Sequence, residues 1–167
     1  ADHGRLYATY TEQMARGMDD LCRQADVIVP NLTEAAILLE EPYQEHPSGA
    51  QVARMLRDLH RRYGCRQVVL TGVEQEGLLG AAAYDAQTGR FSFTGKPMLP
   101  GIFYGTGDVL ASALLAGLLR DKTLEAAVEL AVSFTYESML HTLDNGLPLR
   151  YGVAFEQAIP MLVNALA

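Results

Sequence analysis

The residues best suited to chemistry lie in a short glycine-rich stretch, 105–108 (GTGD), which opens a long run of helix-forming residues. Glycines at 105 and 107 let the backbone approach a ligand closely, and free amides at a helix start attract anions. Asp108 then places a carboxylate beside that anion site, which suits phosphoryl transfer from a bound phosphate to a hydroxyl group. The alternative is that Asp108 only stabilises the first helical turn, where a carboxylate gains about 0.3–1 kcal/mol from the helix dipole.

This stretch matches neither of two common phosphate-binding motifs. Leu110 stands where the dinucleotide motif GxGxxG has its third glycine, and no Gly-Lys-Ser/Thr sequence follows. The prediction of a phosphate site therefore rests on the properties of a glycine-rich helix start.

A second group of polar residues, 30–34 (PNLTE), directly follows an apolar, β-branched run. Ligands of α/β sheets bind beyond the carboxyl ends of the strands, so this turn is expected to face a crevice. Asn31 and Glu34 offer the oxygen ligands that magnesium prefers. The same spacing also predicts a capping box, with Asn31 as the N-cap and Glu34 closing it, and the sequence leaves both interpretations open.

Thr71 and Gly72 follow another apolar run and form the third candidate. We expect them at the end of a strand, where a hydroxyl group and a bare backbone can hold a nucleotide phosphate. A simple turn is the alternative.

Apolar periodicity predicts the elements that position these residues. Helices are expected over 11–23, 33–40, 48–63, 107–119, 124–140 and 155–166, the last bent or begun near Pro160. Strands are expected over 26–30 and 68–72, and a hairpin over 78–84 and 91–94. Helices that alternate with short apolar strands indicate an α/β fold with a layered sheet.

Composition excludes several classes of function. A net charge of −7 argues against a nucleic-acid surface. No apolar run reaches the roughly 18 residues of a membrane span, so no membrane partner is expected. Cys22 and Cys65 form no CxxC pair and the four histidines are scattered, which favours a reduced, cytoplasmic compartment.

The three candidate groups occur in one small α/β chain and in an order that resembles the ribokinase superfamily, which has an Asn-x-x-Glu motif and a C-terminal Gly-x-Gly-Asp. Within it, the stretches VPNLTEAAILLEEPY, GTGDVLASALLAGLL and RYGVAFEQAIPML are similar to the bacterial pyridoxal kinases. The resemblance implies a three-layer α/β/α sandwich and the ATP-dependent phosphorylation of the 5′-hydroxymethyl group of pyridoxal, pyridoxine or pyridoxamine. Related hydroxymethylpyrimidine or sugar kinases, and a non-catalytic nucleotide-binding fragment, are the alternatives.

The resemblance also implies a role for each matching residue. Asp108 would be the catalytic base, and the amides of 105–107 (Gly105, Thr106 and Gly107) would hold the transferred phosphoryl group. Glu34 and Asp2 would belong to the magnesium site. The ATP contacts would come from Asn31, Thr71, Gly72, Thr106 and a nucleotide-binding loop made of Leu99, Pro100 and Gly101.

The resemblance covers the whole chain as one partial kinase domain, 1–167, on the nucleotide-binding side. It implies magnesium, ATP as co-substrate, a possible role for a monovalent cation, and a homodimer. Kinases of this family have roughly a further hundred residues before the position of Ala1, a size that fits an α/β domain. We therefore expect a sheet that is incomplete on its N-terminal side, and a chain that is inactive by itself.

Overall fold

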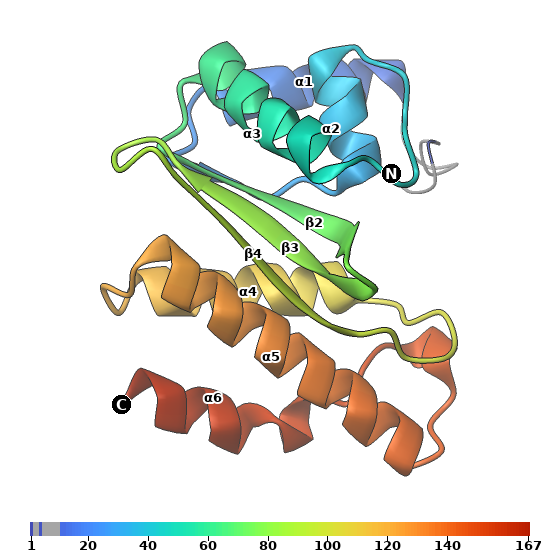
Figure 1. Cartoon of the computed structure of the whole chain (residues 1–167). Coiled ribbons are helices and arrows are strands. Elements are labelled where there is room, and N and C mark those ends of the chain that lie inside the picture. The colour runs from blue at the N-terminus through green and yellow to red at the C-terminus, as the bar shows by residue number, and fades with distance from the viewer. Residues whose placement is uncertain (2–3, 5–10) are drawn as a thin grey trace. The chain divides into compact units, whose positions relative to one another are not determined.

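A computed structural model describes residue 1, residue 4 and residues 11–167, which form two compact units, Ala1–Phe93 and Thr94–Ala167 (Figure 1). The first unit combines a sheet with three helices. Its elements are α1 (Glu12–Cys22), β1 (Val27–Ile28), α2 (Leu32–Leu39), α3 (Gly49–Tyr63), β2 (Gln67–Gln75), β3 (Leu78–Asp85) and the start of β4 (Arg90–Pro97), within which the unit ends.

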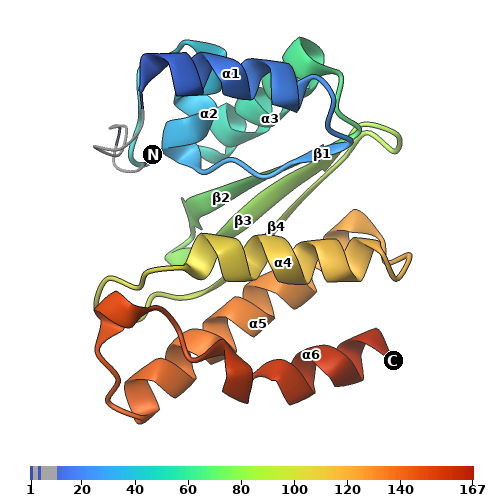
Figure 2. The same cartoon turned by 180° about the vertical axis from the view of Figure 1, so that it is seen from behind.

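The strand order in the sheet is β1-β2-β3-β4. β1 pairs with β2 in parallel, with Val27 opposite Gln67, and β2 pairs with β3 antiparallel. Helices α1, α2 and α3 lie together over the sheet, and Figure 2 shows β1 at its edge beneath α1. Among the described strands β1 is paired on one side only, which agrees with the expected incomplete sheet.

Local signals set the helix boundaries where the sequence predicts them. Thr11 accepts a hydrogen bond from the Met14 amide and begins α1. Ser48 and Gln51 form a capping box at the start of α3, and Gly64 ends that helix in the left-handed conformation. The predicted helices and strands of this unit are confirmed, with ends that differ by a few residues.

The prediction for Thr71 and Gly72 is wrong in one respect, because they do not end a strand. β2 continues to Gln75, and the pairing register with β3 shifts between Thr71 and Val73. Gly72 is the extra residue of this irregularity and adopts a φ of 71°, which a residue without Cβ accepts most easily. The two residues therefore lie at a bulge inside a long strand.

The core of the first unit lies between its helices and one face of the sheet. Leu56 and Leu59 from α3 are fully buried against Val68 and Leu70 of β2. Burying each such side chain contributes about 1.5–3 kcal/mol. This core fixes β1, which leads to Asn31 and Glu34, and β2, which carries Thr71 and Gly72.

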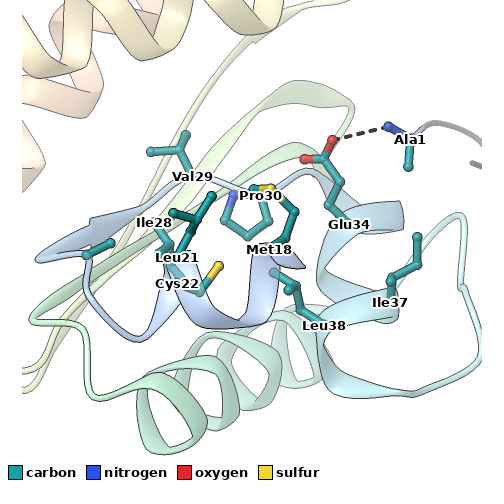
Figure 3. A pocket seen from close by; sticks show the side chains of 11 residues that line it. Ala1, Met18, Leu21, Cys22, Ile28, Val29, Pro30, Glu34, Ile37 and Leu38 are labelled. Atoms are coloured by element: carbon teal, nitrogen blue, oxygen red, sulfur yellow. Dashed lines mark hydrogen bonds and ion pairs between the residues drawn. The ribbon is translucent and has the colours of Figure 1, made fainter. Parts of the chain in front are cut away.

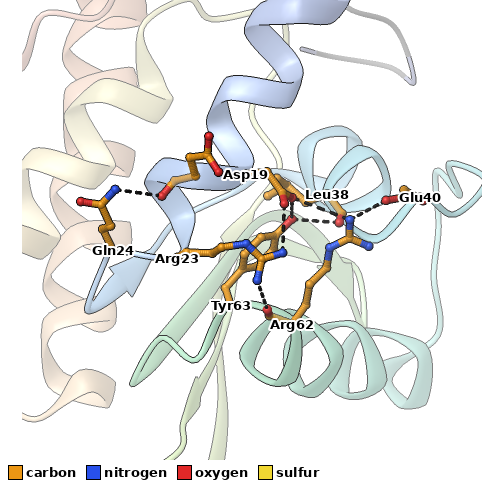
Figure 4. Close-up of polar contacts among 8 residues, drawn as sticks. Asp19, Arg23, Gln24, Leu38, Glu40, Arg62 and Tyr63 are labelled. Atoms are coloured by element: carbon orange, nitrogen blue, oxygen red, sulfur yellow. Dashed lines mark hydrogen bonds and ion pairs between the residues drawn. The ribbon is translucent and has the colours of Figure 1, made fainter.

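A cluster of polar contacts holds α1, α2 and α3 together (Figure 4). The Tyr63 hydroxyl lies 2.5 Å from a carboxylate oxygen of Asp19 and 3.0 Å from the Leu38 carbonyl oxygen. Arg23 contacts the other Asp19 oxygen, and Arg62 contacts Glu40. The Tyr63 hydrogen bond and these cations hold the pKa of Asp19 below its usual value.

The second unit is mainly helical. It contains α4 (Thr106–Leu118), α5 (Leu124–Asp144), two short 3₁₀ turns (Leu149–Tyr151 and Phe155–Gln157) and α6 (Ile159–Leu166). Gly117 lets α4 approach α5, because a Cβ at this position would lie 3.0 Å from the Ala127 Cβ. Pro160 stands in the first turn of α6, so the last helix begins there as predicted. In the described part of the chain no helix is long and apolar enough to span a membrane.

Candidate functional site

The start of α4 has the properties of an anion site. Gly105 is its N-cap, with a φ of 77°, and no side chain caps the helix. The first amides of a helix have no carbonyl partner within it, so the amides of Thr106 and Gly107 are available to a ligand. A Cβ built on Gly105 or Gly107 would meet nothing within 4 Å, so the space beside this backbone is open.

Asp108 is exposed in the first turn of α4. Among the described residues, its carboxylate takes part in no hydrogen bond or ion pair, so it does not cap the helix. A carboxylate next to free helix amides can accept a proton from a hydroxyl group that approaches a bound phosphate. The start of α4 therefore places an exposed carboxylate beside amides that have no partner within the helix.

The loop that leads into α4 contains the predicted nucleotide-binding residues. Leu99 is half-buried, whereas Pro100 and Gly101 are exposed. Gly101 has a φ of 103°, and a Cβ there would lie 2.5 Å from the Leu149 Cδ1 atom. Leu149 thus packs directly on this loop within the second unit.

Asn31 and Glu34 form the predicted capping box at the start of α2. The Asn31 Oδ1 atom accepts from the Glu34 amide at 2.9 Å, and the Glu34 Oε2 atom accepts from the Asn31 amide at 3.0 Å. Two amides that α2 cannot satisfy internally are therefore paired. The structural role of both residues is confirmed.

The capping box leaves the second carboxylate oxygen of Glu34 available. The capping box uses Oε2, and the side chain of Glu34 is 43% exposed. The Asn31 Nδ2 atom donates to the Ala1 carbonyl oxygen at 2.7 Å. Glu34 can therefore cap α2 through Oε2 while its Oε1 atom takes no part in the capping box.

The structure brings Thr71 next to this turn. The Thr71 amide donates to the Pro30 carbonyl oxygen at 2.9 Å, and Asn31 forms a parallel bridge with Thr71. A Cβ built on Gly72 would meet nothing within 4 Å, so the backbone at the bulge is approachable. Asn31, Glu34, Thr71 and Gly72 thus form one group in the first unit, whereas residues 99–101 and 105–108 belong to the second.

The metal prediction has limited support from ligand geometry. Asp2 lies outside the described residues. Within residue 1, residue 4 and residues 11–167, no group of three or more His, Cys, Asp or Glu side chains could hold a metal ion. Glu34 alone fits a magnesium ion that keeps several water molecules and is bound mainly through nucleotide phosphates.

A pocket of about 310 Å³ lies beside α1, β1 and α2 (Figure 3). Met18, Leu21, Ile28 and Ile37 are among its lining residues, and Glu34 stands at one end. Burial raises the pKa of the lining residue Cys22, which disfavours the reactive thiolate. Among the described lining residues, Glu34 is the one with a charged side chain, and most of the others are apolar.

Sequence reasoning missed the residues that shape the surroundings of the α4 start. Thr142 is fully buried in α5 and accepts a hydrogen bond from the Ala154 amide at 2.8 Å. Gly152 has a φ of 97°, and a Cβ there would lie 3.8 Å from the Tyr104 carbonyl oxygen. The sequence signal for this contact is a hydroxyl residue on the buried face of α5, and Thr135 and Ser138 share that signal without making a second bond of this kind among the described residues.

Comparisons with known proteins connect this geometry to a family. The profile of the phosphomethylpyrimidine kinase family matches residues 5–150. A Bacteroides thetaiotaomicron protein designated a phosphomethylpyrimidine kinase, crystallised with pyridoxal, is 31% identical, with a TM-score of 0.90 over 97% of this chain. The pyridoxal kinase of Lactobacillus plantarum is 32% identical, with a TM-score of 0.86 over 98% of this chain. Pyridoxal kinase from Leishmania donovani, crystallised with ADP and pyridoxamine, is 26% identical, with a TM-score of 0.74 over 87%.

The chain spans only about half the length of these structures: 57% of the Bacteroides protein, 58% of the Lactobacillus kinase and 48% of the Leishmania kinase. The α/β fold is confirmed as part of the pyridoxal kinase fold. Relatives bind ADP and vitamers of B6, as the crystallised complexes show. The chain belongs to the phosphomethylpyrimidine kinase family, within the ribokinase superfamily, and is homologous to pyridoxal kinases.

Proposed function

We propose that this chain is the nucleotide-binding part of a kinase that transfers the γ-phosphoryl group of ATP to the 5′-hydroxymethyl group of pyridoxal, pyridoxine or pyridoxamine. The observation that carries the proposal is the start of α4, where uncapped amides adjoin an exposed carboxylate that has no partner among the described residues. Family membership and the pyridoxal kinase homologues support the same reaction. In this proposal both compact units belong to one kinase domain.

Asp108 takes the proton of the substrate hydroxyl as that oxygen attacks the γ-phosphorus. The amides of Gly105, Thr106 and Gly107 hold the phosphoryl oxygens and stabilise the charge that they carry in the transition state. Because these donors belong to the backbone of a helix start, they are oriented before the nucleotide binds. The protein contributes positioning and charge stabilisation, which dominate phosphoryl transfer.

The first unit supplies the remaining nucleotide contacts in this proposal. Asn31, Thr71 and Gly72 would contact ATP, and Glu34 would help to hold magnesium through its carboxylate. Magnesium, when bound, neutralises part of the phosphate charge. The loop of Leu99, Pro100 and Gly101 borders the nucleotide, and the whole enzyme acts as a cytoplasmic homodimer.

A second candidate is phosphorylation of a hydroxymethylpyrimidine, because the matching family profile is that of phosphomethylpyrimidine kinase. The two candidates share the chemistry at Asp108 and differ in the ring that carries the hydroxymethyl group. A panel of three B6 vitamers and hydroxymethylpyrimidine, with ADP release as readout, separates them. The panel requires a polypeptide with the full length of the solved relatives.

The test of the reaction is Asp108→Asn in that polypeptide. Asn has nearly the same shape but cannot take the proton, so kcat should fall by about 10²–10⁴-fold while ATP affinity changes little. ADP binding to the present chain, measured by calorimetry, tests the nucleotide site directly. Near-normal turnover with a lowered melting temperature would show that Asp108 only stabilises α4.

A further inference from the structure

Helix α5 carries three buried hydroxyl side chains, those of Thr135, Ser138 and Thr142. Each donates a hydrogen bond to the carbonyl oxygen four residues earlier, at 2.8, 2.7 and 2.7 Å respectively. This is the usual way in which a helix satisfies a buried Ser or Thr. By these bonds alone, all three hydroxyl groups would only be satisfied within their own helix.

Thr142 differs from the other two because its oxygen also accepts a hydrogen bond. The donor is the Ala154 amide at 2.8 Å, twelve residues further along the chain. Ala154 is buried, with 8% exposure, so its amide would lose its partner without that hydroxyl group. A buried amide without a partner is strongly disfavoured, which makes this bond a fixed point for the segment that follows α5.

The segment fixed in this way packs on the loop that leads into α4. Leu149 fills the space beside Gly101, and a Cβ built on Gly152 would lie 3.8 Å from the Tyr104 carbonyl oxygen, at ordinary van der Waals distance. Both glycines adopt a positive φ, and at Gly101 a Cβ would clash with the Leu149 side chain. Tyr104 directly precedes Gly105, the left-handed N-cap of α4.

We propose that Thr142 is a positioning residue for the phosphate-binding turn: by fixing Ala154 it holds the segment that packs Leu149 on Gly101, and so supports the loop that leads into the amides after Gly105. This inference rests on the proposed function for its link to the nucleotide. Thr142 is fully buried and the site is open, so Thr142 acts through the loop and not by contact with the ligand.

The experiment compares Thr142→Val with Thr135→Val in this chain. Both changes replace a buried threonine of α5 by a residue of the same shape, and both remove the hydroxyl group that bonds its own helix. Only Thr142→Val removes the partner of Ala154. Thr142→Ser keeps a hydroxyl group and serves as the rescue variant.

The first readout is independent of nucleotide. In Thr142→Val, amide exchange at Ala154 should accelerate about tenfold or more, the equilibrium effect of a typical hydrogen bond. The amide resonances of Gly105, Gly107 and Gly152 should shift, whereas Thr135→Val and Thr142→Ser leave them near their wild-type positions. If the two valine variants behave alike, or if Thr142→Ser does not rescue, the proposal is overturned.

The second readout is ADP affinity, followed at the amide resonances of residues 105–107. Thr142→Val should weaken ADP binding several-fold, and Thr135→Val should not. If the wild-type chain binds no ADP, the proposed function fails, but the first readout still decides the positioning role. If Thr142→Val does not fold, Thr142→Ala and Thr135→Ala give the same comparison.

Discussion

Replacement of Glu34 tests whether one carboxylate caps α2 and also serves a cation. Glu34→Gln keeps an oxygen for the Asn31 amide, since Gln also closes capping boxes, but removes the charge. Glu34→Ala removes both. The pair of variants therefore separates the two roles that the sequence alone leaves as alternatives.

The structure gives the size of each effect. Glu34→Ala loses the hydrogen bond to the Asn31 amide at 3.0 Å, worth about 0.5–1.5 kcal/mol. It also loses the interaction of the carboxylate with the start of α2, worth about 0.3–1 kcal/mol. We expect Glu34→Gln to lose only the second contribution.

Thermal unfolding and ADP titrations at increasing magnesium measure the two roles. At about 2–4 °C for each kcal/mol in a chain of this size, Glu34→Ala should lower Tm by roughly 2–10 °C and Glu34→Gln by about half as much or less. Both variants should lose magnesium dependence of ADP affinity to the same degree. Wild-type magnesium dependence in Glu34→Gln would refute the cation role, and equal Tm losses would refute the separation of cap and charge.

Two further predictions concern stability within each unit. In the first unit, Asp19→Asn should destabilise the protein above about pH 4, and the difference from wild type should shrink as the pH falls. Folding lowers the pKa of Asp19, so the ionised carboxylate stabilises the folded protein above the pKa of the unfolded chain. This stabilisation is lost as the pH falls through the lower pKa of the folded protein. Urea unfolding across pH checks this, with Asp20→Asn as the control; a difference that does not change with pH would contradict it. In the second unit, Gly117→Leu should cost about 1–3 kcal/mol, because a Cβ there already lies 3.2 Å from the Ala127 Cα. An unchanged urea midpoint would show that α4 and α5 can separate without cost.

The sequence predicts the elements well wherever the signal is local. The sequence predicts α3 over 48–63 with Gly64 as its stop, and the structure confirms Ser48 as the N-cap and Gly64 as the C-cap. The apolar face of α3 likewise predicts the buried residues Leu56 and Leu59. These signals are read within one helix, so no knowledge of the remaining fold is needed.

Contacts between distant segments could not be predicted in the same way. The bulge at Thr71 and Gly72 depends on the register between β2 and β3, which a run of β-branched residues does not specify. The bond from the Ala154 amide to Thr142 depends on where the chain returns after α5. Both features shape the candidate site, and both arise only when the chain is folded.

Glu34 and Asp108 show why sequence alone could not settle the candidate site. Both are acidic residues at the third position of a helix, α2 and α4, and the same capping explanation applies to both. Glu34 closes a capping box because Asn31 provides the reciprocal side chain, whereas Asp108 follows Gly105, which has no side chain to offer. A helix start without a cap leaves its amides unsatisfied by the protein, and a bound anion is the partner that would satisfy them. Gly105 does not cap α4 with a side chain and so leaves its first amides free. The first turn of α4 is therefore a stronger candidate for phosphate binding than the capped first turn of α2.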